Sequence, residues 1–405
     1  MIHLAHDAAA PARRLMRWRG LATACLAHFT HDGYSDMLYL LLPFWQRELA
    51  LSLTEVGVMK TLYSGAMALF QIPSGMAGER LGERWLLAGG TVVAALAVLA
   101  FGWAASPFAL FALLALSGMG ASVQHPLSSV VVAKAHDGAG LRAALSTYNF
   151  AGDLGKVAIP GVVALLIARF GWPTATHLAG LFGLLVAAVI LTSLRRPLRK
   201  ATTGEASAAP SAPLAEPARR RAFAALSSIG VVDSATRTGY LTFLPFLLTG
   251  KGVTAATLGL MLSLTFAGGA LGKFACGVLA ARLGVLRTVI ATEAATALGI
   301  VALLAAPLNV CLALALPIGI ALNGTSSVLY GSVAELAPRD RRARAFGFFY
   351  TITIGSGALA PTAYGAVSDA MGVPWTMVLV AAVVLLVVPL TLPLRGAFIA
   401  GPARS

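Results

Sequence analysis

Three ionisable residues lie at regular spacing inside the first long apolar stretch of the chain. His28, Asp32 and Asp36 follow one another at intervals of four residues, so a helix would place them on one stripe of its surface. A carboxyl group in an apolar medium, with an imidazole one turn away, can bind and release a proton near neutral pH. The pattern makes all three candidates for proton coupling, with Asp32 nearest the middle of the span. The alternative is a structural cluster of hydrogen bonds or ion pairs that closes a helix contact.

A second polar group lies in a later apolar stretch, where one helical face carries Tyr148, Asn149, Asp153 and Lys156. Asp153 and Lys156 are three residues apart and can pair with each other as neutral scaffolding. Lys156 can instead pair with Asp32 across a cavity, or bind an anionic substrate. We therefore treat Asp153 as a candidate for proton coupling and the other three as candidates for substrate binding.

The second half of the chain carries a similar set of charges. Asp233 and Arg237 are four residues apart, and Lys273 lies in the next apolar stretch. Arg237 can bond Asp233, and Lys273 can extend its amine toward the cytoplasm, in which case both are structural. Charges inside a membrane are expensive, however, and an apolar drug alone would not require so many. A carboxylate, phosphonate or zwitterionic substrate would, so Asp233 is a candidate for proton coupling and the two cations for substrate binding.

Neutral polar residues in the apolar stretches provide further candidates for orienting a ligand: Gln124, His125, Asn323 and Tyr350. His125 precedes Pro126, so its ring can equally bond the carbonyl that a proline leaves free. Two other charged residues fall in apolar stretches. Lys60 lies near one end of its stretch, where it could reach the membrane interface, and we predict no role for Glu293.

Several classes of chemistry have no motif in this sequence. The three cysteines, Cys25, Cys276 and Cys311, have no metal-ligand spacing. There is no paired-histidine metal motif, no phosphate-binding loop for a nucleotide and no nucleophile elbow. We therefore expect no metal, no cofactor, no direct use of ATP and no enzymatic activity.

Membrane-spanning helices must position these residues. The 405-residue chain is 58% hydrophobic and 11% charged, whereas soluble domains are about 25% charged. Its apolar runs are about 20 residues long, as a bilayer-spanning helix requires, and the Gly and Ala in them are typical of close-packed membrane helices. The sequence predicts an all-α polytopic membrane protein with twelve transmembrane helices, at 20–44, 53–78, 85–105, 108–134, 142–168, 173–194, 221–249, 254–280, 286–306, 309–336, 343–369 and 374–394.

Basic residues are unevenly divided between the two sides of these spans. Of the 30 Lys and Arg residues, 23 fall on the side of the termini and three on the other. The positive-inside rule then places both termini in the cytoplasm. The net charge of +14 would face anionic lipid headgroups rather than nucleic acid. We expect a monomer in the cell (inner) membrane. Residues before Trp18 are polar and basic, which predicts no cleavable signal peptide.

The two halves of the chain repeat each other at an offset of 202 residues. Pro43 returns as Pro245, Arg80 as Arg282, and further positions follow the same offset. A parallel repeat of this kind is typical of carriers that bind their substrate between two halves. The repeat predicts two pseudo-symmetric six-helix bundles with a cytoplasmic linker and two tails, divided as 1–19, 20–194, 195–220, 221–394 and 395–405.

Five residues of the charged turn after the second span resemble the loop signature of the major facilitator superfamily: Gly75, Glu79, Arg80, Gly82 and Arg84. The resemblance covers all twelve spans. It implies a gating role, in which Glu79 and Arg80 meet helix ends and latch the cytoplasmic side. The second copy keeps Arg282 but has Ala281 in the acidic position, so the latch would be asymmetric. Alternatively, these residues only set topology and close helix approach.

Two further motifs resemble a narrower branch of that superfamily, the fosmidomycin-resistance exporters. One is His28-Phe29 with Asp32 in the first span. The other, in the fourth span, is His125-Pro126 followed by a pair of serines after one intervening residue. The resemblance implies a transporter of the export type.

The leading hypothesis is therefore a proton-coupled secondary carrier that works by rocker-switch alternating access. It would export a small anionic or zwitterionic organic molecule or drug. One alternative is a proton-coupled uptake symporter for an organic anion. A non-transporting membrane scaffold is a weaker alternative, because a scaffold would be expected to carry a long soluble domain or a large polar loop.

The gating interpretation predicts the effect of replacing the loop carboxylate. Glu79→Ala is expected to slow transport while equilibrium substrate binding stays largely intact, because a latch controls conformational exchange and does not touch the ligand. Transport rate and binding affinity of the purified protein would be measured side by side. Equal loss of both would contradict a gating role.

Overall fold

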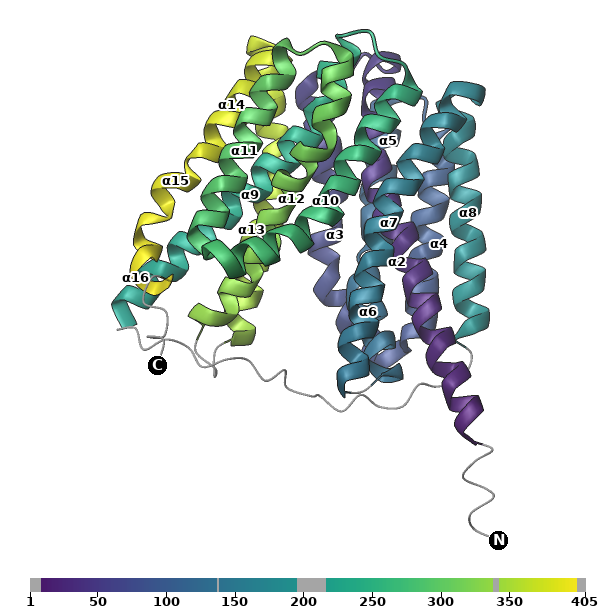
Figure 1. Ribbon diagram of the computed structural model, residues 1–405. Helices are drawn as coiled ribbons and strands as arrows, with labels where there is room; N and C mark the ends of the chain where they lie inside the picture. The colour runs from purple at the N-terminus through teal and green to yellow at the C-terminus, as the bar shows by residue number, and fades with distance from the viewer. Residues whose placement is uncertain (1–8, 137, 195–215, 338–341, 399–405) are drawn as a thin grey trace. The chain divides into compact units, whose positions relative to one another are not determined.

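The computed structural model describes residues 9–136, 138–194, 216–337 and 342–398, and within these ranges all secondary structure is helical (Figure 1). Residues 195–215 of the predicted linker lie outside the described residues, as do the ends of both predicted tails. The prediction of an all-α protein is confirmed.

The helices follow the predicted spans closely. The first half of the chain contains α2 (Ala9–Glu48), α3 (Leu53–Leu81), α4 (Glu83–Phe101), α5 (Pro107–Ala121), α6 (Gln124–Ala135), α7 (Gly138–Phe170) and α8 (Trp172–Ser193). The second half contains α9 (Glu216–Thr249), α10 (Ala255–Leu283), α11 (Val285–Ala305), α12 (Leu308–Leu336), α13 (Arg342–Met371), α14 (Val373–Leu385), α15 (Val387–Leu390), η2 (Leu392–Leu394) and α16 (Arg395–Phe398). Ten predicted spans fall on one long helix each, the fourth on α5 and α6, and the twelfth on α14, α15 and η2.

Polarity differs between the helices in a way that points to the site. By length and composition, eight of the helical segments in the described ranges are apolar enough to cross a membrane, with α5 and α6 counted as one. The helices α2, α3, α9 and α13 are long enough but more polar. Two of these, α2 and α9, carry the acidic candidates Asp32, Asp36 and Asp233. These two helices therefore combine the length of a membrane span with buried acidic residues.

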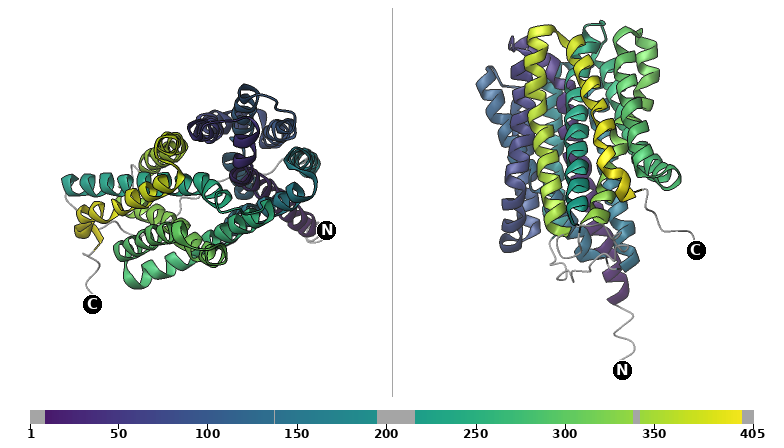
Figure 2. Two further views of the ribbon diagram at one scale, coloured as in Figure 1. Left: turned by 90° about the horizontal axis from the view of Figure 1, so that it is seen from above. Right: turned by 90° about the vertical axis from the view of Figure 1, so that its left-hand side faces the viewer.

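The helices group into two compact units. Unit 1 contains α2 up to Met37, α3 from Ala66 onward, and α4 to α8; unit 2 contains residues 38–65 and α9 to α16. The remaining parts of α2 and α3 therefore pack with unit 2. The two further views in Figure 2 show that the helices of each unit run side by side along most of their length.

Each unit has its own apolar core on the side of the candidate residues. In unit 1, Leu127, Val131 and Ile190 are buried together with the ring of Tyr148. In unit 2, Leu226, Ile229, Val289 and Leu329 are buried together with Phe349. These cores fix the faces that α6, α7, α9, α11 and α12 turn toward their neighbours.

The fourth span is broken at Ser122 and Val123, between α5 and α6. Pro126 has no N–H to donate to the carbonyl four residues earlier, which weakens the helix at this point. The Ser122 hydroxyl donates to the carbonyl of Met119 at 2.7 Å and lies 2.8 Å from the Ser74 hydroxyl. His125 follows directly after the break, in the first turn of α6.

The two halves repeat at the level of the backbone as well as the sequence. Gly82 and Gly284 join equivalent helices with φ of 83° and 85°, and Gly171 and Gly372 do the same with 81° and 87°. Positive φ disfavours residues with a Cβ. These turns allow consecutive helices to reverse direction with one residue between them, which supports the predicted repeat.

Within unit 2, α3 and α13 meet along a close seam. A Cβ at Gly57 would overlap the backbone at Pro361, and one at Gly365 would overlap Leu53. At the start of α3, the Asp369 carboxylate accepts hydrogen bonds from the backbone N–H groups of Leu53 at 2.7 Å and Thr54 at 2.9 Å, and from the Thr54 hydroxyl. Asp369 therefore caps a helix that is more than 300 residues away in sequence.

The cap predicts a graded effect on stability. Asp369→Ala leaves the first N–H groups of α3 without an acceptor and is expected to destabilise the protein by about 1 kcal/mol, the usual effect of losing a helix N-cap. Asp369→Asn keeps an acceptor oxygen and serves as the matched control, with a smaller effect. Thermal unfolding in detergent measures both. Equal destabilisation by the two variants would show that charge, not capping, matters at this position.

Candidate functional site

Glycines allow α2 and α7 to approach closely in unit 1. A Cβ at Gly155 would overlap the backbone at Phe29, and one at Gly33 would overlap the side chain of Ile159. A Cβ at Gly152 would lie 2.6 Å from His28 Nε2 and 2.8 Å from Asp32 Oδ2. The absence of side chains at these positions is what lets polar groups from the two helices touch.

Lys156 of α7 lies beside both acids of α2. Its Nζ is 3.4 Å from Asp32 Oδ2 and 4.0 Å from Asp36 Oδ2. The Lys156 side chain is 30% exposed, whereas that of Asp32 is 11% exposed. Of the arrangements that the sequence allowed for Lys156, the structure therefore contains the contact with Asp32. The partly exposed amine is the accessible end of this ion pair.

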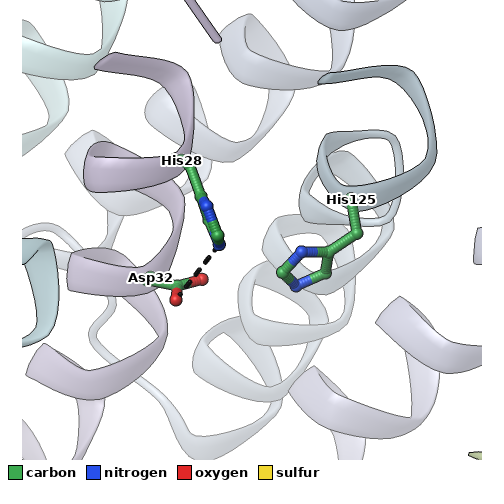
Figure 3. A group of neighbouring side chains, drawn as sticks. All are labelled: His28, Asp32 and His125. Atoms are coloured by element: carbon green, nitrogen blue, oxygen red, sulfur yellow. Dashed lines mark ion pairs between the residues drawn. The ribbon is translucent and has the colours of Figure 1, made fainter. Parts of the chain in front are cut away.

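Three histidines surround the same carboxylate. His28 Nε2 is 3.3 Å from Asp32 Oδ2, and His31 Nε2 is 3.8 Å from Oδ1. The ring of His125, on α6, meets those of His28 and His31 edge-on, with centroids 5.3 Å and 4.8 Å apart. Figure 3 shows His28 and Asp32 on one helix with His125 reaching toward them from another.

Hydrogen bonding requires a proton within the His28–Asp32 pair. His28 Nδ1 lies 2.9 Å from the carbonyl oxygen of Tyr148, and a carbonyl can only accept, so Nδ1 donates. A neutral imidazole has one N–H, which leaves Nε2 as an acceptor toward Asp32. Either His28 is an imidazolium that donates to the carboxylate, or Asp32 is protonated and donates to Nε2. Both arrangements contain one exchangeable proton.

The ligand types of this cluster also suit a metal ion. Atoms of His28, Asp32 and His125 lie within 4.8 Å of one another, and histidine nitrogens with a carboxylate oxygen are common zinc ligands. However, the ammonium group of Lys156 already supplies a cation to Asp32. A second cation beside it would be repelled. The residues present fit an ion pair with a proton better than a metal, so we retain the expectation of no metal.

The remaining unit 1 candidates lie at different distances from this cluster. Tyr148 is buried, and its ring stacks on His28 with centroids 4.2 Å apart. Gln124 is buried next to the helix break, where its Oε1 accepts a 2.6 Å hydrogen bond from Ser128. Asp153 is half-buried and Asn149 is exposed. Tyr148 therefore packs against the histidine cluster, Gln124 is bonded within its own helix, and Asn149 points away from the core of unit 1.

Unit 2 contains a smaller polar site. Asp233 is buried on α9 near Arg237, and both line a cavity of about 30 Å³ with residues of α12 and α13 that include Tyr330 and Thr353. Tyr350 is 43% exposed and stacks on Tyr330 with centroids 4.8 Å apart. The structure thus brings Asp233, Arg237 and the tyrosine pair into one region.

Two other candidates of unit 2 lie apart from that cavity. Asn323 Nδ2 donates to the carbonyl of Gly319 at 3.3 Å, within its own helix α12. Lys273 on α10 is exposed. Neither lines the Asp233 cavity among the described residues.

Two charged residues without a predicted role have defined surroundings. Glu293 of α11 is 2% exposed and contacts Asp233. Lys60 is buried, with its amine 4.2 Å from the ring centroid of Tyr39 and 5.3 Å from that of Tyr63. Such cation–π contacts stabilise a buried ammonium group. Lys60 therefore lies among aromatic rings rather than at an interface.

A larger cavity of about 830 Å³ opens at the ends of α9, α12 and α13. Its walls are mainly apolar, with Phe223 and Phe348 among them, and its charged lining consists of Arg219, Arg220 and Arg344. An apolar pocket with guanidinium groups suits an organic molecule that carries an anionic group.

In the charged turn, side-chain contacts are made by Glu83 and by the gating candidate Arg84. Glu83 forms an ion pair with Lys134 at the end of α6, and Arg84 Nε donates to the carbonyl of Leu191 near the end of α8 at 3.0 Å. The other charged gating candidates, Glu79, Arg80 and Arg282, are exposed. The Glu83–Lys134 pair was not predicted, although opposite charges at the ends of two neighbouring spans could have suggested it.

The glycines of the turn allow it to pack closely. A Cβ at Gly75 would lie 3.7 Å from Pro126, in ordinary contact. A Cβ at Gly78 would overlap Leu127. Gly82 provides the positive φ that separates α3 from α4. The turn is therefore packed against α6 at Pro126 and Leu127, the two residues that follow His125.

Long apolar helices with buried ion pairs between them define a polytopic membrane transporter. The chain belongs to the Major Facilitator Superfamily, whose sequence profile matches residues 24–247 and 226–402. Over 152 residues the chain is 28% identical to the Fosmidomycin resistance protein of Escherichia coli (strain K12). That match spans 37% of this chain and 37% of the relative.

Solved transporter structures share the fold. A bacterial homologue of the human lysosomal transporter Spinster, in an inward-facing and occupied conformation, has a TM-score of 0.78 at 16% identity, covering 95% of this chain and 98% of its own. The nucleoside transporter NupG has a TM-score of 0.76 at 13% identity, covering 94% and 99%. A POT family transporter in complex with 5-aminolevulinic acid has a TM-score of 0.74 at 14% identity, covering 92% and 95%. The predicted major facilitator fold is confirmed.

The glycine between the two polar faces predicts a sharp steric effect. In Gly152→Ala, the new methyl group would lie within 2.8 Å of His28 Nε2 and Asp32 Oδ2 and displace one of them. We expect transport to be lost while the helical content is kept. Gly140→Ala, on the same helix with open space around it, is the matched control. Circular dichroism and transport in proteoliposomes measure the two effects, and full activity of Gly152→Ala would contradict the close contact.

Proposed function

We propose that this protein is a proton-coupled secondary transporter that works by alternating access and exports a small zwitterionic or anionic organic molecule. The observation that carries the proposal is the polar cluster of unit 1, where Lys156 pairs with Asp32 and His28 Nε2 lies 3.3 Å from the same carboxylate. We further propose that the protein lies in the inner membrane with both termini in the cytoplasm, as the distribution of basic residues predicts.

The cluster supports proton coupling because its ion pair and its proton are interdependent. Protonation of Asp32 removes one of the two negative charges beside the ammonium group of Lys156, the other being that of Asp36. Lys156 then attracts an anionic group of a substrate more strongly. Conversely, an anion bound at Lys156 withdraws the counter-charge of Asp32 and favours its protonation. Buried opposite charges respond strongly to such changes, since little water is present to screen them.

The charges also limit the class of substrate. The partly exposed amine of Lys156 and the guanidinium groups around the larger cavity favour a ligand with a carboxylate or phosphonate group. The apolar walls of that cavity favour an organic body attached to this group. The relative named for fosmidomycin resistance supports fosmidomycin, a phosphonate, as the first compound to test.

The charge of the substrate bears on the direction of transport. A purely anionic ligand at Lys156 promotes proton binding at Asp32, which is compatible with uptake of ligand and proton together as well as with export. A ligand with an amino group competes with the proton for Asp32, so ligand and proton exchange and export results. The same cluster therefore supports uptake of an organic anion as a second candidate function, and a zwitterion fits export better than a simple anion.

The α3–α13 seam supports alternating access as the mechanism. It joins a helix from the first half of the chain to one from the second, through Asp369, a pair of threonines and two glycines. Thr61 donates to the carbonyl of Ala358 and lies 2.7 Å from the Thr362 hydroxyl. Where a glycine contacts the backbone of the other helix, few apolar side chains have to separate when the helices move apart. Such a seam therefore suits repeated opening and closing.

Asp32→Asn tests the proposal. In proteoliposomes with an imposed pH gradient, the wild-type protein is expected to accumulate labelled fosmidomycin against its concentration gradient. Asn cannot carry the exchangeable charge, so the variant is expected to lose this accumulation.

Exchange of labelled for unlabelled fosmidomycin without a pH gradient is the internal control, since it reports folding and substrate binding without proton movement. Unchanged accumulation by Asp32→Asn would remove Asp32 as the proton carrier. If fosmidomycin does not bind, a thermal-shift screen over phosphonates, carboxylates, amino acids and cationic dyes identifies the ligand, and binding of cationic dyes alone would contradict the substrate class.

A further inference from the structure

Unit 2 contains a pair of buried acids that the histidine cluster of unit 1 does not explain. Asp233 of α9 is 5% exposed and Glu293 of α11 is 2% exposed. Glu293 lies in the middle of a helix with a mean hydropathy of 1.9 over its apolar window. An ionised carboxylate at such a place is expensive unless it is paired or neutralised.

The two carboxyl groups are within hydrogen-bonding contact of each other. Ionised carboxylates are acceptors only, so a hydrogen bond between two of them requires that one be protonated. The pair therefore contains a proton whenever the contact is made.

The surroundings of the two acids indicate which of them holds the proton. Arg237 lies on the same helix as Asp233 and lines the same cavity, so it stabilises an ionised Asp233. Glu293 lies outside that cavity, in the apolar α11. A protonated Glu293 has one O–H, which it can donate to the carboxylate of Asp233.

The other oxygen of the same carboxyl group fits this assignment. Among the described residues, Glu293 Oε1 is buried without a hydrogen-bond partner. An unsatisfied oxygen of a neutral carboxyl group costs much less than an unsatisfied ionised oxygen. A protonated Glu293 therefore explains both its hydrogen bond to Asp233 and its unpartnered Oε1.

The charges around the pair balance when one proton is present. The ionisable groups that face it are Arg237 from α9, Cys276 from α10, and Tyr330 from α12, which lies near Asp233 and Arg237. The helices α14 and α15, which also pack against α11, carry no ionisable residue, and Arg395 of α16 is exposed. Two acids and one guanidinium group become neutral with one proton.

A route for the proton adjoins Asp233 but not Glu293. Asp233 and Arg237 line the cavity of about 30 Å³, and Glu293 does not. A cavity of this size can hold a water molecule between polar groups. Asp233 can therefore exchange a proton with water and pass it to Glu293, while Arg237 compensates the charge that remains on Asp233.

We propose that Glu293 and Asp233 form a proton-binding site inside unit 2, with Glu293 as the proton holder, Asp233 as the relay and Arg237 as the counter-ion. This site adds a second proton site to the proposed coupling function, on which its role in transport rests. Its proton binding is independent of any substrate and is measurable without transport.

Infrared difference spectroscopy of the full-length protein in lipid nanodiscs tests proton binding directly. At pH 7 the wild-type protein is expected to show a protonated-carboxyl band. Glu293→Gln keeps the shape of the side chain without the exchangeable proton and is expected to remove the band, and Asp233→Asn is expected to shift or remove it. Glu79→Gln, which replaces an exposed acid, is the control and should leave the band in place.

Three results would overturn the site: no such band in the wild-type protein, an unchanged band in Glu293→Gln, or a band lost only in Asp32→Asn. Circular dichroism and thermal unfolding of each variant verify folding, and Asp233→Asn provides an independent reading if Glu293→Gln fails to fold.

Transport separates this inference from the proposed function. Glu293→Gln is expected to lower pH-gradient-driven accumulation of fosmidomycin about tenfold, within the usual range of coupling between two sites, and to retain gradient-free exchange. Full accumulation by this variant would overturn the coupling role. If the wild-type protein moves no fosmidomycin but shows the band, the proposed substrate fails and the proton site stands.

Discussion

The ion pair between Asp32 and Lys156 depends on a close approach of α2 and α7 that only glycines permit. A charge in the interior of a membrane protein must find its partner within a few ångströms, because neither water nor lipid headgroups can stabilise it there. Gly152 and Gly155 remove the side chains that would separate the two helices. Histidines from α2 and α6 then complete the surroundings of the carboxylate. In unit 1 the ion pair can therefore form only because small residues allow the two helices to pack closely.

Unit 2 meets the same constraint with different chemistry. Unit 1 places an ammonium group against two acids, whereas unit 2 places two acids together beside one guanidinium group. In unit 1 the pair is accessible through Lys156, and in unit 2 the deepest acid, Glu293, is shielded by Asp233. The backbone turns repeat between the halves, but the buried acids and their cationic partners do not. The proposed mechanism places one proton site in each unit, with a different set of charges around it.

The helices could be predicted well from the sequence because the hydrophobic length of a membrane span is a local signal. Every predicted span coincides with helical structure. The contacts of the site could not be predicted in the same way, because residues that pair across different helices have no characteristic spacing in the sequence. Lys156 could have paired with Asp153 or Asp32 on spacing alone. The role of Glu293 needs Asp233, 60 residues earlier, and the burial of Lys60 needs the rings of Tyr39 and Tyr63. Such contacts are set by tertiary packing, not by helical period.

The four glycine turns at Gly82, Gly171, Gly284 and Gly372 show which part of the internal repeat is most constrained. Their positive φ restricts each position to glycine, whereas side chains facing a substrate are free to diverge as the cargo changes. The repeat between the two halves is therefore best preserved in the turns between helices. Glu79 and Ala281 occupy equivalent positions of the two halves and differ, whereas the turns at Gly82 and Gly284 have nearly the same φ. In this protein the two halves resemble each other in the backbone angles of their turns and differ in the charges of their buried polar sites.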